Sequence, residues 1–93
     1  MAYDNLQKAE AYGKIIEAFV FECCIDRRKP FDWLTCVRSA LLLQAFNEFL
    51  ARREQGEARL SPVMFGRILR RLGFIPSRSN VSFWHGICLK SSP

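Results

Sequence analysis

The strongest structural signal in the chain is a short helix with a marked start and a marked end. Ser61 can accept hydrogen bonds from the free backbone amides of a helix N-terminus, and Pro62 suits the first helical position. Gly73 suits the left-handed position that commonly follows the last turn of a helix. The segment therefore predicts one helix over residues 61–72, and this prediction does not depend on the rest of the chain.

This helix has two different faces. Its apolar residues follow the i, i+3, i+4, i+7 spacing of a face that packs on a core, and they are Phe65, Ile68, Leu69 and Leu72. The remaining positions are then directed to solvent, and they are Val63, Gly66, Arg67, Arg70 and, in part, Arg71. The sequence predicts a helix whose outer face carries arginine.

A β-hairpin is expected over residues 74–90. The runs 74–76 and 81–89 are rich in apolar and β-branched residues, and they flank the polar stretch 77–80, which has turn chemistry and carries Arg78. Phe83 and Trp84 are adjacent in the second run, so one is expected to face the interior and the other to face outward. The hairpin should therefore present a basic tip.

Two further helices and a strand are expected before residue 61. Apolar residues recur at three- and four-residue steps from Tyr3 to Cys24, which predicts a long helix followed by a surface loop over 26–30. The segment 35–38 reads as a short strand, and Ser39 reads as the cap of a helix that starts at Ala40 and stops at Gly56.

This order of elements predicts a single α+β, mainly α, domain over residues 1–93. Three helices, a short strand and a C-terminal hairpin occur in the order of a winged helix-turn-helix, in which residues 1–18 can form an N-terminal extension. In that fold the capped third helix, here 61–72, enters the DNA major groove as the recognition helix. The hairpin, here 74–90, is the wing.

The charge distribution favours a polyanionic partner. All nine acidic residues lie between Asp4 and Glu57, where eight basic residues nearly cancel them, whereas residues 58–93 hold six basic residues and no acid. Such a one-sided surface is expected where Lys and Arg neutralise phosphates, although a solvated basic surface is the alternative. The candidate double-stranded DNA contacts are Arg59, Ser61, Val63, Gly66, Arg67, Arg70, Arg71, Arg78, Ser79, Asn80 and Lys90. Arg67, Arg70 and Arg78 are expected to form one contiguous patch.

Several of these segments also occur in a known family. They are the Phe-x-x-Glu-Cys-Cys sequence that starts at Phe19, the Phe-x-x-Phe pair at 46–49, the Leu-Ser-x-x-x-Phe-Gly-Arg-x-Leu sequence at 60–69, and Trp84-x-Gly86-Ile87. From about Phe19 to Lys90 the chain resembles the C-terminal winged-helix domain of phage and plasmid primase-helicases, which poxvirus-type replicative helicases share. The resemblance implies that Ser61 caps the recognition helix, that Arg67 lies on its exposed side, and that residues 84–87 close the sheet under the wing. It also implies a role in the replication of mobile elements or its regulation.

Nothing in the sequence points to catalysis. No serine or carboxylate lies at a spacing typical of a catalytic set, and His85 occurs in an alternating run, as a surface strand residue would. Gly56, Gly66, Gly73 and Gly86 do not cluster into a phosphate-binding loop. We therefore predict that the protein is not an enzyme and needs no cofactor.

Metal binding and membrane insertion are not expected either. The four cysteines, at positions 23, 24, 36 and 88, form no CxxC unit, so we interpret them as core or partly buried thiols, with a disulfide or a metal as the alternative. No apolar run reaches the ~18 residues of a membrane span, and no signal-peptide pattern is present, which predicts a cytoplasmic protein.

A second function class stays open. The same fold can dock on a protein partner, and Phe31, Trp33 and Val63 are the apolar residues expected to do so. A homodimer through the first helix is a further hypothesis, which rests on Tyr3, Leu6 and Tyr12.

Overall fold

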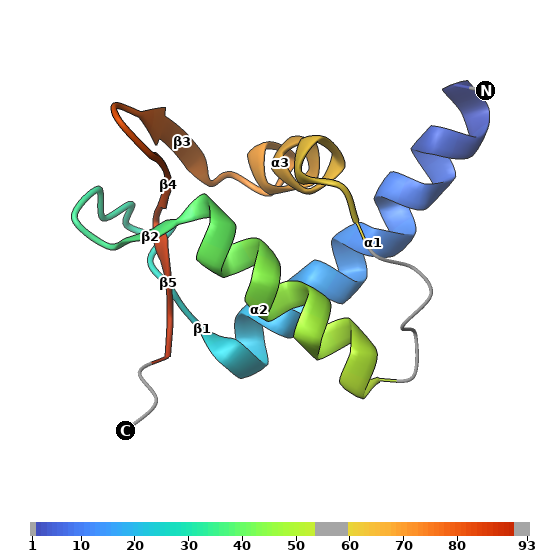
Figure 1. Cartoon of the computed structure of the whole chain (residues 1–93), viewed down its shortest axis with the longest axis horizontal. Coiled ribbons are helices and arrows are strands. Elements are labelled where there is room, and N and C mark those ends of the chain that lie inside the picture. The colour runs from blue at the N-terminus through green and yellow to red at the C-terminus, as the bar shows by residue number, and fades with distance from the viewer. Residues whose placement is uncertain (1, 54–59, 91–93) are drawn as a thin grey trace.

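The computed structural model describes residues 2–53 and 60–90, and side chains from residue 11 onward. Three helices and antiparallel strands make up this part of the chain (Figure 1), which confirms the predicted α+β class. The elements are α1 (Ala2–Cys23), β1 (Cys24–Asp26), β2 (Cys36–Arg38), α2 (Ser39–Arg52), α3 (Pro62–Arg71), β3 (Ile75–Arg78), β4 (Ser82–His85) and β5 (Ile87–Leu89).

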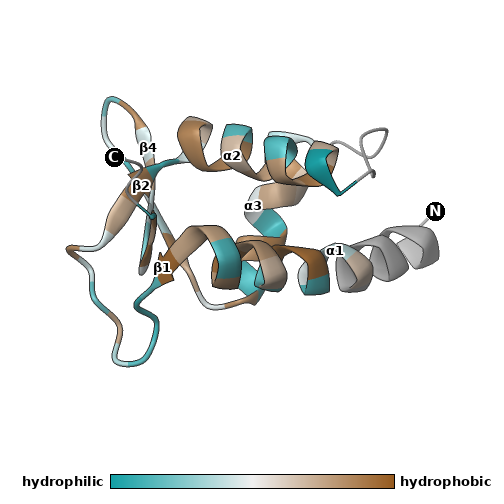
Figure 2. Ribbon diagram, turned by 90° about the horizontal axis from the view of Figure 1, so that it is seen from below, coloured by the Kyte–Doolittle hydropathy of each residue, from teal (hydrophilic) through white to brown (hydrophobic). Residues whose placement is uncertain are grey.

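The core lies where the three helices meet, and aromatic rings fill it. The Phe46 ring packs on Phe19 of α1 at a centroid distance of 5.4 Å and on Phe65 of α3 at 5.2 Å. These rings and the surrounding Leu and Ile side chains are almost completely buried. Figure 2 shows α1 and α2 running past each other, with the strands gathered at one end of the helices. Phe46 of α2 therefore links all three helices.

The strands form two small antiparallel sheets. One has the order β2-β4-β3, with Arg38 opposite Phe83 and Arg78 opposite Ser82. The other pairs β1 with β5, so that Cys24 lies opposite Leu89. Two sequence expectations were incomplete here: the run 81–89 is two strands instead of one, and a short strand, Cys24–Asp26, lies between the first helix and the expected loop.

Gly86 explains both differences. Its φ of +84° is a left-handed conformation that strains any residue with a Cβ, and it turns the chain between β4 and β5. The Phe31 ring lies so close that a Cβ added at Gly86 would be 2.6 Å from it. The turn directs β5 away from the hairpin and onto β1.

The two predicted helix caps had different outcomes. In α3 the Ser61 hydroxyl oxygen accepts a hydrogen bond from the Met64 amide at 3.2 Å, Pro62 is the first helical residue and Gly73 has a φ of +102°, as predicted. In α2 the prediction was wrong, because Ser39 is itself the first helical residue and the cap position belongs to Arg38, which makes no side-chain capping bond. The helix begins directly at the end of β2. Gly56, its expected end, lies outside the described residues.

The thiols differ in burial. Cys24 is buried, Cys23 and Cys88 are half-buried, and Cys36 is exposed on β2, which corrects the prediction that all four are at least partly buried. All four are free thiols. Burial raises the pKa of the Cys24 thiol to about 12, so this group stays protonated at neutral pH.

Arg28 ties the loop after β1 to the rest of the molecule. Its guanidinium donates to the Leu72 carbonyl oxygen at 2.7 Å, to Glu17 at 3.1 Å and to Asp26 at 2.7 Å. It also lies 4.5 Å from the centroid of the Phe74 ring. The Arg28 side chain thus gives a carbonyl at the C-terminal end of α3 its hydrogen-bond donor and holds α1 and β1 beside that end. It also lowers the pKa of the Asp26 carboxyl below its usual 3.8.

We predict that Arg28→Met lowers the free energy of unfolding by about 2–3 kcal/mol, because charge-assisted hydrogen bonds are lost and a carbonyl is left without its donor. Arg27→Met is the matched control, since Arg27 is exposed, and it should change stability by less than about 0.5 kcal/mol. Urea unfolding measures both. Equal stability of the two variants would contradict the assigned role of Arg28.

The same pair gives a pH prediction. Because the pKa of Asp26 is lowered in the folded state, its contribution to stability is present above the ordinary pKa of 3.8 and is lost as the pH falls through the lower folded value. Urea midpoints measured from about pH 5 to about pH 2.5 should therefore fall less steeply in Arg28→Met than in the wild type.

Two glycine substitutions should have opposite effects. Gly86→Ala should destabilise by about 3 kcal/mol, because it adds left-handed strain to a clash with Phe31. Gly13→Ala should stabilise by about 0.5–1 kcal/mol, because Gly13 lies inside α1 with nothing within 4 Å of the added Cβ. Thermal unfolding measures both, and a neutral Gly86→Ala would show that the turn does not require glycine.

Candidate nucleic-acid interface

The outward side of α3 carries the stripe that its sequence predicts. Val63, Arg67 and Arg70 are spaced i, i+4, i+7 and are all exposed, Val63 to 65%. On the opposite side Phe65, Ile68 and Leu69 are buried in the core. The core therefore sets the rotation of α3 about its axis and leaves this stripe in solvent.

Two flanking residues differ in their surroundings. Arg71 is exposed at the end of α3. Gly66 is only partly accessible, because the Trp84 ring lies 3.4 Å from the position that a Cβ would occupy. The expectation that Gly66 faces solvent was therefore wrong: its missing side chain gives room to Trp84 of β4. Trp84 is the inward-facing member of the 83–84 pair and is buried.

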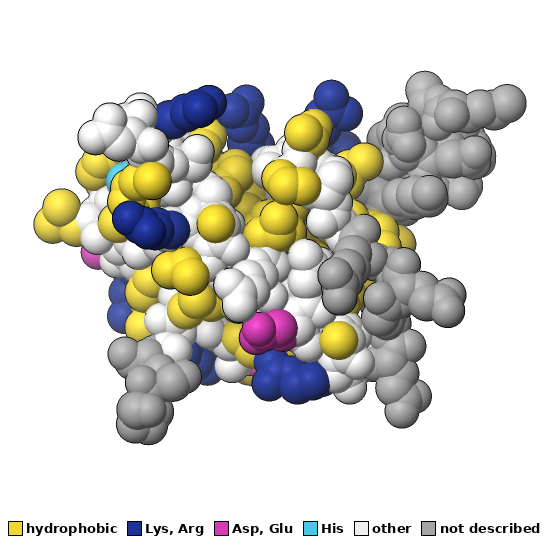
Figure 3. Space-filling view, viewed as in Figure 1, with side chains coloured by type: hydrophobic (Ala, Val, Ile, Leu, Met, Phe, Trp, Pro, Cys, Tyr) yellow, Lys and Arg dark blue, Asp and Glu magenta, His cyan; other side chains and the backbone are white. Residues whose placement is uncertain are grey.

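The β3–β4 hairpin follows α3 directly and remains in contact with it. Arg78 ends β3, and the exposed residues Ser79 and Asn80 form the tip, where the Ser79 amide donates to the Val81 carbonyl oxygen at 3.2 Å. Figure 1 shows α3 and the hairpin along the same upper edge of the molecule. In Figure 3 dark-blue Lys and Arg side chains gather over this edge, and no magenta carboxylate is visible among them.

The described ion pairs do not include the arginines of this edge. Among the described residues the ion pairs join Arg28 to Glu17 and Asp26, and Arg53 to Glu22. Arg67, Arg70, Arg71 and Arg78 therefore form no ion pair within the described part of the chain. We call these four residues the arginine edge.

Two candidate contacts are not placed on this edge. Lys90 follows β5, and its ammonium group donates to the Phe21 carbonyl oxygen at 3.3 Å, beside the end of α1. The turn at Gly86 carries it there, away from the hairpin. Arg59 lies outside the described residues. Ser61 is exposed at the start of α3, where its oxygen already accepts the capping bond.

His85 is not a surface residue, which corrects the sequence expectation. It is 7% exposed, because the Trp33 ring stacks on it at a centroid distance of 3.7 Å and an interplanar angle of 4°. Its Nδ1 lies 2.7 Å from the Trp33 carbonyl oxygen, which requires a proton on Nδ1, and its Nε2 lies 2.6 Å from the Ser77 hydroxyl. His85 thus holds the loop after β1 against the sheet.

The same loop carries two of the three residues predicted to bind a protein, Phe31 and Trp33, whereas the third, Val63, is exposed on α3. Phe31 is half-buried against Gly86, so it serves the fold, whereas Trp33 is 50% exposed and its neighbour Leu34 is 88% exposed. Of the residues proposed for a homodimer, Tyr12 packs against the core, and the side chains of Tyr3 and Leu6 lie outside the described part. The homodimer stays a prediction.

The candidate contacts expected from the sequence do not include one further exposed arginine, Arg38. Arg38 is exposed at the cap position of α2 and belongs to no described ion pair. The signal was available, because Arg38 is the last residue of the predicted strand and precedes the predicted helix, a position from which a side chain can reach an anion at the helix start.

Metal and membrane sites are not evident in residues 2–53 and 60–90. No group of three or more His, Cys, Asp or Glu side chains there could hold a metal ion. No helix of this part is both long enough and apolar enough to cross a bilayer. No family model, curated protein or solved structure matches the chain.

Proposed function

We propose that this protein binds double-stranded DNA as a non-catalytic winged helix, with α3 in the major groove and the β3–β4 hairpin on the adjacent backbone. The observation that carries the proposal is the arginine edge: four exposed arginines on one helix and the hairpin that follows it, with no described carboxylate paired to any of them. A surface that concentrates unpaired positive charge is favoured where a polyanion offsets the repulsion.

The topology supports the same proposal. A winged helix places its first strand between the first two helices and pairs it with the last strand of the hairpin. Here β2 lies between α1 and α2 and pairs with β4, which in turn pairs with β3, giving the order β2-β4-β3. The β1–β5 pair is a second, separate sheet in addition to this arrangement.

The dimensions and chemistry of α3 suit the major groove. Its ten residues correspond to a length of about 15 Å, and the groove of B-DNA is about 12 Å wide. Arg67 and Arg70 lie on the stripe that would face the bases, where a guanidinium can donate two hydrogen bonds to a guanine edge. Arg71 and Arg78 flank the stripe and suit phosphate contacts.

The biological setting proposed is the replication of mobile elements or its regulation, in the cytoplasm. It rests on the resemblance of residues 19–90 to the winged-helix domain of phage and plasmid primase-helicases. DNA binding itself rests on the arginine edge and does not depend on this setting.

Fluorescence anisotropy with labelled mixed-sequence duplexes tests the proposal. If about four phosphates are neutralised, log affinity should fall with log salt at a slope of about −3 to −4. The double variant Arg67→Ala/Arg70→Ala should flatten this slope by about two. Lys90→Ala is the matched control, because Lys90 also belongs to the acid-free segment but lies beside α1, and it should leave the slope unchanged.

Two results would contradict DNA binding by this surface. One is no binding to any duplex at tens of micromolar protein in low salt. The other is an equal loss of slope in Lys90→Ala and in the double variant, which would indicate a general charge effect instead of an interface.

A protein-docking function is the second candidate, and the exposure of Trp33 and Leu34 on one loop favours it. The two functions depend on different residues. Docking should be weakened by Leu34→Ala and depend little on salt, whereas DNA binding should be indifferent to that change. Leu34 is the better probe, because Trp33 also stacks on His85.

A further inference from the structure

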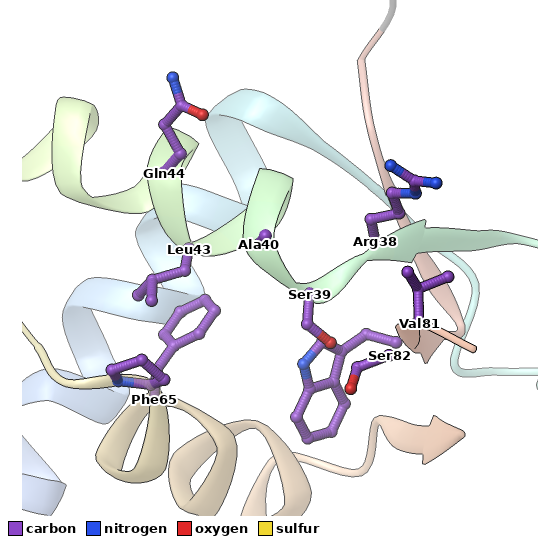
Figure 4. A pocket seen from close by; sticks show the side chains of 10 residues that line it. Arg38, Ser39, Ala40, Leu43, Gln44, Phe65, Val81 and Ser82 are labelled. Carbon is purple, nitrogen blue, oxygen red and sulfur yellow. The ribbon is translucent and has the colours of Figure 1, made fainter. Parts of the chain in front are cut away.

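The first turn of α3 places Val63 on the outward side of the helix. Figure 4 shows Leu43 of α2 directed toward the Phe65 ring of α3, across a groove of about 530 Å³ that also borders the hairpin. Val63 precedes Phe65 by two residues, which corresponds to about 200° around a helix, so the two side chains point in nearly opposite directions. Val63 is therefore 65% exposed, whereas Phe65 is buried.

The exposed start of α3 offers little that can form a hydrogen bond with a base. The Ser61 oxygen already accepts the Met64 amide, Pro62 has no backbone N–H, and the Val63 side chain has only methyl groups. The basic residues of α3 begin at Arg67, one turn further along, and the helix contains no acidic residue. The stripe thus begins with an apolar group and continues with cationic ones.

These two parts of the stripe match two different groups in the major groove of DNA. A recognition helix contacts base edges with its N-terminal residues. The apolar group that these edges present is the C5-methyl group of thymine, whereas guanine presents two acceptors that suit an arginine side chain. Val63 therefore suits a thymine and Arg67 suits a guanine.

The spacing along the stripe is close to the spacing of base pairs. Val63 and Arg67 are four residues apart, which is about 6 Å along a helix. Two steps of B-DNA span about 6.8 Å, at about 3.4 Å each. The two side chains can therefore reach base pairs that are separated by about one pair.

We propose that Val63 reads the methyl group of a thymine that lies about two base-pair steps from a guanine read by Arg67. The inference rests on the proposed DNA binding and adds a sequence preference to it. Arginine alone supplies less of this preference, because guanidinium groups also pair with the phosphates of any sequence. Valine has one strongly preferred rotamer in a helix, so its methyl groups are held in a fixed position on the stripe.

Selection from a randomised duplex pool with the full-length chain provides the sites for the test. The selected sequences should contain a thymine at a constant distance of about two steps from a guanine. Deoxyuridine at that position removes only the methyl group, and it should weaken binding in fluorescence anisotropy by about fourfold, the effect of one buried methyl group. A 5-methylcytosine·guanine pair at the same position should bind more tightly than the unmethylated pair by about the same factor.

Three variants assign the effect to Val63. Val63→Ser has no methyl group and should bind the thymine and deoxyuridine duplexes equally, whereas Val63→Thr keeps one methyl group and should keep the preference. Val81→Ala is the matched control, because Val81 is also an exposed valine but lies on the hairpin side of the groove in Figure 4, and it should keep the full preference. The salt slope should be the same in Val63→Ser and the wild type, because no phosphate contact is lost. Circular dichroism shows that each variant is folded.

The outcomes separate this inference from the proposed function. It is overturned by selected sites without a thymine at that distance, by equal affinity of the wild type for the thymine and deoxyuridine duplexes, or by a preference that persists in Val63→Ser. A preference lost equally in Val81→Ala would also overturn it. In each of these cases DNA binding, with its salt slope of about −3 to −4, would stand. No binding to any duplex would instead contradict the proposed function itself.

Discussion

The left-handed turn at Gly86 is the constraint on which the arrangement of the strands depends. It ends β4 while that strand is paired on both sides, and it directs β5 across to β1 at the end of the first helix. Because the residue has no side chain, the Phe31 ring can pack directly on it. The loop that follows β1 is thereby laid over the sheet, where Trp33 covers His85. One backbone conformation thus decides which strand pairs with which, and which side chains the loop buries.

The orientation of α3 depends on contacts at both of its ends and along one side. Ser61 satisfies a backbone amide at its start, and Arg28 satisfies the Leu72 carbonyl just beyond its last residue. Between them the buried Phe65, Ile68 and Leu69 set its rotation. The arginines need no contacts of their own to point outward. Charge is placed at this edge by apolar packing on the other side of the helix.

Two sides of α3 have different surroundings. The stripe with Arg67 and Arg70 faces solvent, whereas Pro62 and Phe65 line the groove shared with α2 and the hairpin. Only the stripe is basic, and the described ion pairs do not include Arg67 or Arg70.

The sequence by itself determined the three helices and the capping of α3, because caps and helical periodicity are local properties of a few adjacent residues. It also determined the stripe of Val63, Arg67 and Arg70 and the absence of acidic residues after Glu57. Only the tertiary structure decided the partners of the strands, the burial of His85, the separation of Lys90 from the arginine edge, and the place of Arg38 on a groove. Each of these depends on residues far apart in the chain, such as Cys24 and Leu89 or Trp33 and His85, being brought together. The turn that brings them together is at Gly86, a single glycine in a run that otherwise has the pattern of a continuous strand. The conformation of Gly86 therefore follows from the packing of Phe31 and from strand pairing, and not from the local sequence pattern.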